Sequence, residues 1–428
     1  MATDIASRFR SHQSQHCERG QGEFIRAAYL HVPFCHRRCY YCDFPVSVVG
    51  DRPLNGARHT LAHYVAVLGQ EIAATPPSGV PLETVFLGGG TPSLLSPQQV
   101  GDLLTRLDRR FGLAADAEIS MEVDPGTFNT ERLRGYGAAG VNRLSLGVQA
   151  FQGELLAVCG RAHSLADTYA ALDCIQRAGF SNLSLDLIFG LPHQSQTQWQ
   201  ASLTEAVRLG PTHLSCYGLT LEPETPFGRQ LSPNRPPLPS EDAAAQMYRQ
   251  AQRTLTAAGY THYEIANYAL PGYQCRHNRQ YWENRPFYGL GMGASDRVGG
   301  QRLTRPVTRR RYYAWVWQLQ RHGWQPSRAS APEADDLLEG LMLGLRLREG
   351  IRLRWLRQHC SSPALHRIEP ILQHHNQRGW IEALDASGRA VALENGQPVP
   401  AQGRLRLSDP EGFLVSNAVL ADLFAQLE

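Results

Sequence analysis

The chain of 428 residues contains no lysine, because all 42 of its basic residues are arginine. This absence excludes mechanisms that need a lysine amine, such as the Schiff bases of pyridoxal phosphate enzymes and aldolases. It also excludes the P-loop, whose lysine reaches the phosphates of a nucleotide, and the protein kinases, which need a lysine on a strand. Any anionic group that binds here must therefore be held by arginine or by the backbone.

A strong charge of one sign and a long apolar run are also missing. The 42 basic residues nearly balance 39 acidic ones, for a net charge of +3, so the composition does not indicate a protein that coats nucleic acid. No apolar run approaches the roughly 18 residues that a membrane helix needs, and residues 1–24 lack the apolar core of a secretory signal. We expect a cytoplasmic protein without a membrane span, for which peripheral contact with a membrane stays open.

The chain has nine cysteines, and three of them, Cys35, Cys39 and Cys42, crowd into one short segment directly after a predicted strand. This spacing favours a metal site in a reducing compartment over disulfides. Three thiolates from one loop can hold three irons of a [4Fe–4S] cluster and leave the fourth iron open for another ligand. The alternative is a zinc site that His31 or His36 completes. The cysteines alone do not distinguish between the two.

Between residues 27 and about 221, six apolar runs alternate with stretches of helical periodicity. Near-continuous hydrophobicity is typical of parallel strands that are covered on both faces. We predict a helix over residues 61–72 and another that begins with a capping box at Ser96. Because six βα units are too few for a closed eightfold barrel, we predict an α/β fold with an open three-quarter (βα)6 TIM-like barrel. Ligands of such folds gather at the carboxyl ends of the strands.

We divide the chain into four regions. Residues 1–24 form a flexible N-terminal segment and residues 25–230 the barrel. Residues 231–330 contain a proline-rich linker, a helix and an aromatic- and glycine-rich segment, in which the run Gly289-x-Gly291-x-Gly293 predicts a turn. Residues 331–428 form a C-terminal helical, winged-helix-like domain with a β-wing. Its basic residues form no dense stripe, so we expect no nucleic acid as a partner.

Polar and glycine residues follow successive predicted strands, at the edge where ligands are expected. The run Gly88–Thr91 follows the second strand and offers bare backbone to a ligand. Glu122 ends the third strand, Gln149 ends the fourth, Asp186 lies in the fifth, and Arg161 lies in the loop before a helix. Each of these is unremarkable alone, but together they face the cysteine triad and indicate a ligand site.

These motifs together resemble the radical S-adenosylmethionine (SAM) superfamily, and more narrowly the oxygen-independent coproporphyrinogen III oxidases and the related heme chaperones. The motifs are the cysteine triad, GGGTPS, EVDP, LSLGVQAF, GRAHS and DLIFGLP, and the resemblance covers residues 27 to about 425. It implies that Cys35, Cys39 and Cys42 ligate a [4Fe–4S] cluster whose unique iron takes SAM. It also implies the surrounding residues: Tyr29 beside the cluster, Gly89, Gly90 and Thr91 at the methionine part of SAM, Arg161 at its carboxylate, and Glu122, Gln149 and Asp186 at its carboxylate or ribose side.

Two features favour the heme chaperones over the oxidases. In the oxidases the third cysteine is followed by x-Cys, whereas here Cys42 is followed by Asp43 and Phe44. In addition, YEIANYA (263–269) and HNRQYW (277–282) resemble the YEISN and HNxxYW signatures of the chaperones.

The resemblance implies that His277 of HNRQYW is a heme ligand, since neutral imidazole is a normal axial ligand of heme iron. Cys275 is a weaker candidate. Arg276, Arg279 and Arg285 are candidates to pair with the heme propionates. The residues alone leave open that His277 is a hydrogen-bonded structural histidine.

The implied function is that of a radical SAM heme chaperone, which binds heme and transfers it to recipient proteins with the cluster and SAM as cofactors. The alternative is an oxygen-independent coproporphyrinogen III oxidase, which decarboxylates propionates in porphyrin biosynthesis. The implied partners are heme, heme-receiving apoproteins and an electron donor such as a flavodoxin or ferredoxin. A homodimer is compatible with the sequence. We assign no catalytic residue.

Overall fold

The structure is a computed structural model that describes residues 24–50, 55–324, 333–394 and 399–427. All but the last residue of the predicted flexible segment 1–24 lies outside the described residues, and so does Cys17.

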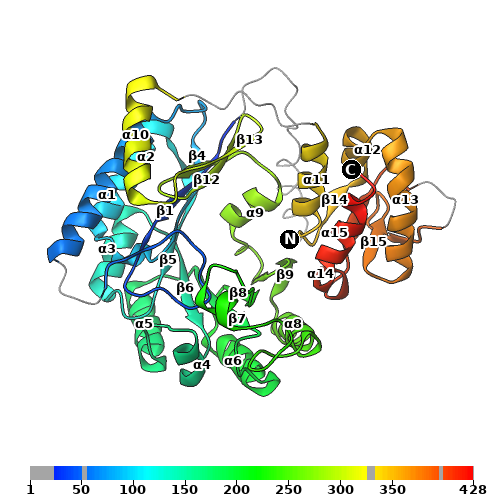
Figure 1. The fold of residues 1–428 in the computed structure, drawn as a ribbon, viewed down its shortest axis with the longest axis horizontal. Coiled ribbons are helices and arrows are strands. Elements are labelled where there is room, and N and C mark those ends of the chain that lie inside the picture. Colours follow the sequence, from blue (N-terminus) through cyan, green and yellow to red (C-terminus); the bar gives the residue numbers. More distant parts are fainter. Residues whose placement is uncertain (1–23, 51–54, 325–332, 395–398, 428) are drawn as a thin grey trace, which may run out of the picture.

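A curved nine-stranded sheet forms the larger part of the molecule (Figure 1), in the order β11-β1-β4-β5-β6-β7-β8-β10-β9. The strands β1 to β8 of this sheet pair in parallel and are the strands of the predicted βα units. The prediction of an open six-unit α/β barrel is therefore confirmed. These strands are β1 (Ala27–Val32), β4 (Leu82–Gly89), β5 (Leu113–Val123), β6 (Arg143–Gln149), β7 (Leu183–Phe189) and β8 (His213–Gly218).

Helices cover the outer face of this sheet (Figure 1). The capping box predicted at Ser96 is present, because Ser96 Oγ accepts from the N–H of Gln99 at 3.2 Å and Gln99 Oε1 accepts from the N–H of Ser96 at 2.8 Å. The helix predicted over residues 61–72 is the middle of a longer helix. The helices of the barrel are α1 (Asn55–Ala74), α2 (Pro97–Phe111), α3 (Thr130–Ala139), α4 (Gly153–Val158), α5 (Leu165–Ala178) and α6 (Gln196–Leu209).

The segment after residue 260 adds strands at both edges of the sheet, which the sequence pattern did not predict. Strand β11 (Tyr288–Leu290) lies parallel to β1, and β10 (Asn267–Ala269) and β9 (Thr261–Glu264) lie antiparallel beyond β8. Gly289 therefore belongs to a strand, whereas Gly291 and Gly293 lie in the turn that the sequence predicted. A Cβ atom on Gly289 would lie 1.9 Å from the carbonyl oxygen of Ser295, so only glycine fits.

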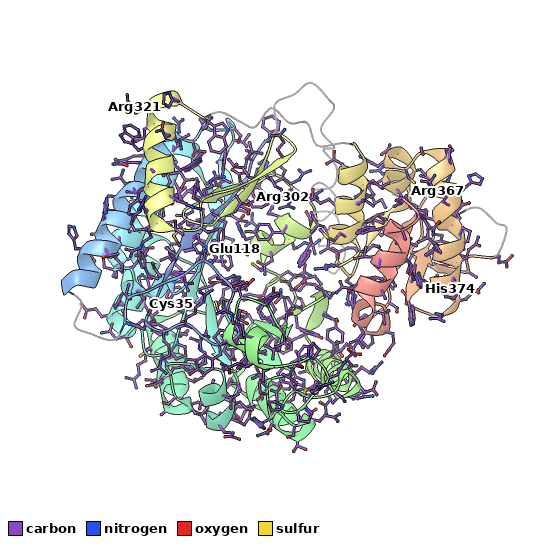
Figure 2. The ribbon with its side chains drawn as sticks, viewed as in Figure 1. Cys35, Glu118, Arg302, Arg321, Arg367 and His374 are labelled. Carbon is purple, nitrogen blue, oxygen red and sulfur yellow. The ribbon has the colours of Figure 1, made fainter. Side chains whose placement is uncertain are left out.

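The short helix α9 (Arg276–Trp282), which carries HNRQYW, closes the barrel at the amino-terminal ends of the strands. Glu118, the central residue of β5 and the pairing partner of Thr84 (Figure 2), accepts from the backbone N–H groups of Arg276 at 2.9 Å and His277 at 3.1 Å. Thr84, near the start of β4, contacts the ring of His277 through its hydroxyl at 2.9 Å. The helix therefore lies at the opposite end of the barrel from the cysteine loop, which follows the carboxyl end of β1.

Further elements connect the barrel to the second domain. No helix in the described part of the chain combines the length and apolarity that crossing a membrane requires. The connecting elements are α7 (Pro226–Gln230), α8 (Glu241–Ala257), the hairpin of β12 (Ser295–Val298) and β13 (Gln301–Thr304), and α10 (Arg309–His322).

The C-terminal helices lie with a four-stranded sheet in the order β14-β17-β15-β16, so the predicted C-terminal helical region is present. In Figure 1 this domain lies beside the barrel, next to α9. Arg249 on α8 joins the two through a double hydrogen bond to Glu411, at 2.7 and 2.6 Å. Its elements are α11 (Glu333–Gly344), β14 (Ile351–Arg352), α12 (Leu353–His359), α13 (Ser362–Gln377), β15 (Ile381–Leu384), β16 (Ala390–Val391), β17 (Arg404–Leu407), α14 (Glu411–Leu414) and α15 (Ser416–Phe424).

Candidate functional site

The three thiols of the predicted cluster loop lie on one segment beyond the carboxyl end of β1. Cys35 belongs to the short strand β2 (Phe34–Cys35), which pairs with β3 (Ser47–Val48). Cys39 and Cys42 lie on the turn between these strands, where the N–H of Cys42 donates to the carbonyl of Cys39 at 3.2 Å. All three are free thiols and half-buried. Burial raises the pKa of Cys35 to about 12, so its thiolate needs a bound metal to be stable.

Both histidines that could complete a zinc site are already engaged, and Nδ1 of His36 lies 2.9 Å from the carbonyl of Gly50. His31 is buried, and its Nδ1 lies 3.0 Å from the Tyr29 hydroxyl while its Nε2 lies 3.1 Å from the carbonyl of Pro45. Within the residues that the structure describes, no three side chains of His, Cys, Asp or Glu converge as a single metal ion requires. The donor set fits a cluster better, because each thiolate then binds an iron of its own.

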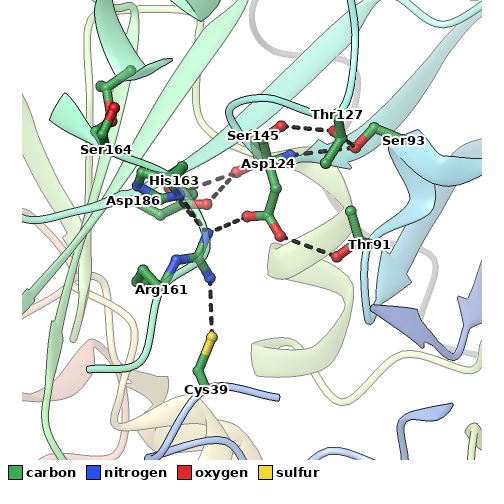
Figure 3. Close-up of polar contacts among 12 residues, drawn as sticks. Cys39, Thr91, Ser93, Asp124, Thr127, Ser145, Arg161, His163, Ser164 and Asp186 are labelled. Atoms are coloured by element: carbon green, nitrogen blue, oxygen red, sulfur yellow. Dashed lines mark hydrogen bonds and ion pairs between the residues drawn. The ribbon is translucent and has the colours of Figure 1, made fainter. Parts of the chain in front are cut away.

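Arg161 lies beside one of these thiols, that of Cys39 (Figure 3). Its NH1 donates to Sγ of Cys39 at 3.5 Å, and its NH2 donates to the carbonyl of Gly147 at 3.1 Å and forms an ion pair with Asp124. Its Nε is buried without a hydrogen-bond partner. A positive charge beside the thiols stabilises the thiolate form that a cluster needs.

Asp124 is a site residue that sequence reasoning missed. Besides pairing with Arg161 it accepts from the hydroxyl of Thr91 at 3.0 Å, so it joins the second and third strand ends (Figure 3). The available signal was its position two residues after Glu122 in the same EVDP motif.

The glycine run after β4 packs against the cysteine loop. The N–H groups of Gly90 and Thr91 donate to the carbonyls of Val32 at 2.9 Å and Phe34 at 2.7 Å, and the N–H of Gly89 donates to Glu122 at 2.9 Å. A Cβ on Gly90 would lie 2.7 Å from the carbonyl oxygen of Phe34. The backbone of this run is therefore less bare than the sequence indicated, and a ligand contact has to use its carbonyl oxygens.

Gln149 converges on the same place from the end of β6. Its backbone has φ of 67°, a left-handed conformation that is uncommon for a residue other than glycine. A Cβ on Gly147 would lie 2.7 Å from the carboxylate of Asp124, 3.0 Å from the side-chain amide of Gln149 and 3.3 Å from the guanidinium of Arg161. Gly147 therefore leaves the space in which these three side chains meet.

A cavity of about 190 Å³ occupies the interior of the barrel between this site and α9. Its lining includes Tyr29, Gly89, Glu122 and Asp186, so it brings together predicted residues from four strands. Asp186 accepts hydrogen bonds from Ser145 and Ser184. It is also close enough to Glu122 for the charge of one carboxylate to act on the other. Burial, helped by the charge of Asp186, raises the pKa of Glu122 to about 8, so Glu122 is largely protonated at neutral pH.

His277 lies at the floor of this cavity, away from the thiols, and is fully buried. Its Nδ1 lies 2.9 Å from the Thr84 hydroxyl, its Nε2 lies 2.8 Å from the Tyr281 hydroxyl, and its ring stacks on Phe86 at 5.3 Å. Burial lowers the pKa of His277 to about 3, so the imidazole is neutral. Both ring nitrogens are engaged, and ligation of an iron would require the contact with Tyr281 to open.

The other candidates of this segment are engaged as well. Cys275 is buried and its thiol donates to Glu118 at 3.5 Å. The three arginines proposed for propionates each have a carboxylate partner on the protein. Arg276 pairs with Asp116 at 3.7 Å, Arg279 with Glu283 at 2.9 Å and Glu349 at 2.5 Å, and Arg285 with Glu283 at 2.6 Å.

The likeness to known proteins agrees with this arrangement. Residues 29–206 match the family model of the radical SAM superfamily. The chain is 44% identical over 402 residues to the heme chaperone HemW of Synechocystis sp. (strain ATCC 27184 / PCC 6803 / Kazusa). This match covers 94% of this chain and 97% of that protein. The chain belongs to this family of heme chaperones. It is also 42% identical to the heme chaperone HemW of Escherichia coli (strain K12), over 63% of this chain and 69% of that protein.

Among solved structures, the coproporphyrinogen III oxidase (HemN) from Escherichia coli, a radical SAM enzyme, has the same fold. The TM-score is 0.75, and the match covers 94% of this chain and 91% of that chain at 23% sequence identity. At this identity the likeness concerns the fold alone.

The half-buried acid Glu122 should make stability depend on pH. The folded protein keeps its proton up to a pH of about 8, whereas the unfolded chain releases it near the ordinary value of 4.5. The contribution of this group to the free energy of unfolding is therefore complete below about pH 4.5 and decreases as the pH rises to about 8. Glu122→Gln, which mimics the protonated acid, should lose less stability than the wild type over this interval in urea denaturation. If the free energies of unfolding of the wild type and of Glu122→Gln changed with pH in the same way, Glu122 would not be protonated in the folded protein.

Proposed function

We propose that this chain is a heme chaperone that binds heme and passes it to recipient apoproteins, with a [4Fe–4S] cluster and SAM as its cofactors. The observation that carries the proposal is the 44% identity to a heme chaperone along nearly the entire length of both chains. The cysteine loop with Arg161 beside it, and the absence of a cysteine in the two positions after Cys42, support the same assignment.

In this proposal Cys35, Cys39 and Cys42 would hold the cluster. SAM would then lie against Gly89, Gly90 and Thr91, with Arg161, Glu122, Gln149 and Asp186 around it and Tyr29 nearby. The chemistry that this cofactor pair supplies when bound is one-electron reduction of a sulfonium. The protein itself provides the orientation: Asp124 fixes the guanidinium of Arg161, and Arg161 donates to Cys39.

We also propose a cytoplasmic location and an electron donor such as a flavodoxin or ferredoxin, since a reducing compartment keeps the three thiols available for iron. For heme, His277 would be an axial ligand after α9 moves enough to separate its Nε2 from Tyr281. A homodimer is a further proposal that follows from the family resemblance alone.

Titration with hemin tests the carrier function. Anaerobically reconstituted protein should develop a Soret band at stoichiometric hemin, with and without SAM. The same titration of His277→Ala tests whether this imidazole is the axial ligand of the heme iron. Tyr281→Phe is the matched variant that keeps the imidazole. A wild-type protein that leaves hemin unbound in every cluster state would refute the proposal.

Oxidase activity is the alternative, and the shared fold with the coproporphyrinogen III oxidase is compatible with it. Incubation of the reduced holoprotein with coproporphyrinogen III and SAM tests it directly. We expect no vinyl groups to form, because Phe44 stands where the oxidases place the extra cysteine. Product formation would replace the chaperone assignment by the enzyme.

The pair of Arg161 and Asp124 should tune the cluster in opposite directions. Asp124→Asn removes the negative charge that pairs with Arg161, the neighbour of Cys39, which should raise the reduction potential by an amount on the order of tens of millivolts. Arg161→Gln removes the positive charge and should lower the potential by a similar amount. Spectroelectrochemical titration of the reconstituted variants measures both. Shifts of the same sign would contradict the electrostatic role of this pair.

A further inference from the structure

Arg143, the first residue of β6, is a buried cation to which the described residues provide no ion-pair or hydrogen-bond partner. Only 2% of its surface is exposed, it lines the barrel cavity, and its Nε has no hydrogen-bond partner. Within the described residues its guanidinium forms no ion pair. Burying a charge without compensation is costly, so proteins usually pair such a group with a counterion or a bound ligand.

The nearest carboxylates do not fill this role, because other donors already use them. Glu118 accepts from the N–H groups of Arg276 and His277, and Asp186 accepts from Ser145 and Ser184. Both acids act on Arg143 only through longer-range electrostatics. The guanidinium therefore keeps its donors for something that enters the cavity.

The cavity has the size and the lining for the carboxylate end of a larger molecule. Its volume of about 190 Å³ corresponds to about six water molecules, at roughly 30 Å³ each in the liquid. That is enough for a short carboxylate chain but too small for a macrocycle. Phe44 and Tyr217 line the same cavity at the carboxyl ends of the strands, and they are 53% and 43% exposed. Their rings form an apolar mouth of the cavity, and the charged Arg143 lies at its floor, near the start of β6.

We propose that the barrel interior is a receptor for a propionate arm of the tetrapyrrole and that Arg143 is the partner of its carboxylate. This inference rests on the proposed function, because the tetrapyrrole is its ligand. It replaces the arginines near α9 that the sequence singled out, since Arg276, Arg279 and Arg285 each pair with an acid of the protein. In this arrangement the ring lies on Phe44 and Tyr217 at the mouth, out of reach of His277 on the floor. This inference therefore also replaces His277 as the axial ligand, and the hemin titration of His277→Ala distinguishes the two placements. Glu122 on the cavity wall, which is assigned to SAM above, is protonated and does not repel the arm, which takes the part of the cavity next to Arg143.

The test compares hemin with hemin dimethyl ester, in which both propionates are esterified. Wild-type holoprotein should bind hemin about 10- to 100-fold more tightly than the ester, the range of a charge-assisted hydrogen bond in a buried site. Arg143→Gln should lose this preference and bind both compounds as weakly as the wild type binds the ester. Arg143→Lys keeps the charge without the two-pronged donor and should retain part of the preference. Arg208→Gln, at an exposed arginine of α6 paired with Glu205, is the matched control and should behave as the wild type.

Three results would overturn the inference. The first is a wild type that binds hemin and its ester equally well, a readout that requires no variant to fold. The second is an Arg143→Gln protein with an unchanged preference for hemin. The third is loss of the preference in Arg285→Gln, which would return the propionates to the arginine on the surface. A wild type that binds neither compound refutes the chaperone proposal itself, so the two failures are distinguishable.

Discussion

Replacement of Cys39 by alanine should abolish assembly of the [4Fe–4S] cluster. In the proposed assignment each of the three thiolates binds one iron, so the loss of one leaves two irons without protein ligands. Cys39 is also the thiol to which Arg161 donates a hydrogen bond. After anaerobic reconstitution and gel filtration, we expect the variant to retain less than about a tenth of the wild-type iron and sulfide.

Cys159 is the matched control for this experiment. It is a fully buried thiol close enough to Cys39 to interact with it electrostatically, and its carbonyl accepts from the N–H of Tyr40 in the cysteine loop. Cys159→Ala should keep a full complement of iron, because this side chain is outside the triad. Full iron in Cys39→Ala, or loss of iron in Cys159→Ala, would show that the ligand set is assigned incorrectly.

Glu71→Gln should lower the free energy of unfolding by about 3 kcal/mol or more, the range for breaking a buried ion pair. Glu71 on α1 accepts from Arg305 at 2.9 Å, from the hydroxyl of Tyr312 at 2.6 Å and from the N–H of Gly291 at 2.8 Å. The side chains of Glu71 and Arg305 are both fully buried. Removal of the charge leaves Arg305 with Asp296 as its remaining carboxylate partner among the described residues. Urea denaturation followed by circular dichroism measures the change.

Glu83→Gln is the control for this second prediction. Glu83 pairs with Arg26 at 2.7 Å, but both side chains are about a third or more exposed. Because exposed ion pairs contribute about 1 kcal/mol or less, this variant should be nearly as stable as the wild type. If the two variants lost similar amounts of stability, the buried network at Glu71 would contribute no more to the free energy of unfolding than an exposed ion pair.

The local parts of the fold followed from the sequence because their causes are local. The capping box at Ser96 and the apolar strands of the barrel depend on residues a few positions apart. The strands β9, β10 and β11 were not predicted, because they contain only three or four residues and their pairing depends on partners far along the chain. Short segments carry too little periodicity to reveal a strand.

The residues of the site also fall into those that the sequence identified and those that only the structure revealed. The resemblance named Cys35, Cys39, Cys42 and Arg161, and the structure places this arginine beside the thiol of Cys39. It did not reveal Asp124, whose role depends on an ion pair across 37 residues, or the unpaired guanidinium of Arg143 in the barrel. A sequence contains the charges but not their partners.

By itself the sequence determined the family, the α/β class and the chemistry that is available. The absence of lysine leaves every anion to arginine or to the backbone, and the cysteine spacing supplies three thiolates on one loop. Only the tertiary structure decided which arginines are already paired and where HNRQYW lies. Arg276, Arg279 and Arg285 look as available in the sequence as Arg143, yet in the fold they meet carboxylates and Arg143 does not. The physical reason is that burial and pairing depend on three-dimensional neighbours, which the spacing of residues along a chain does not specify.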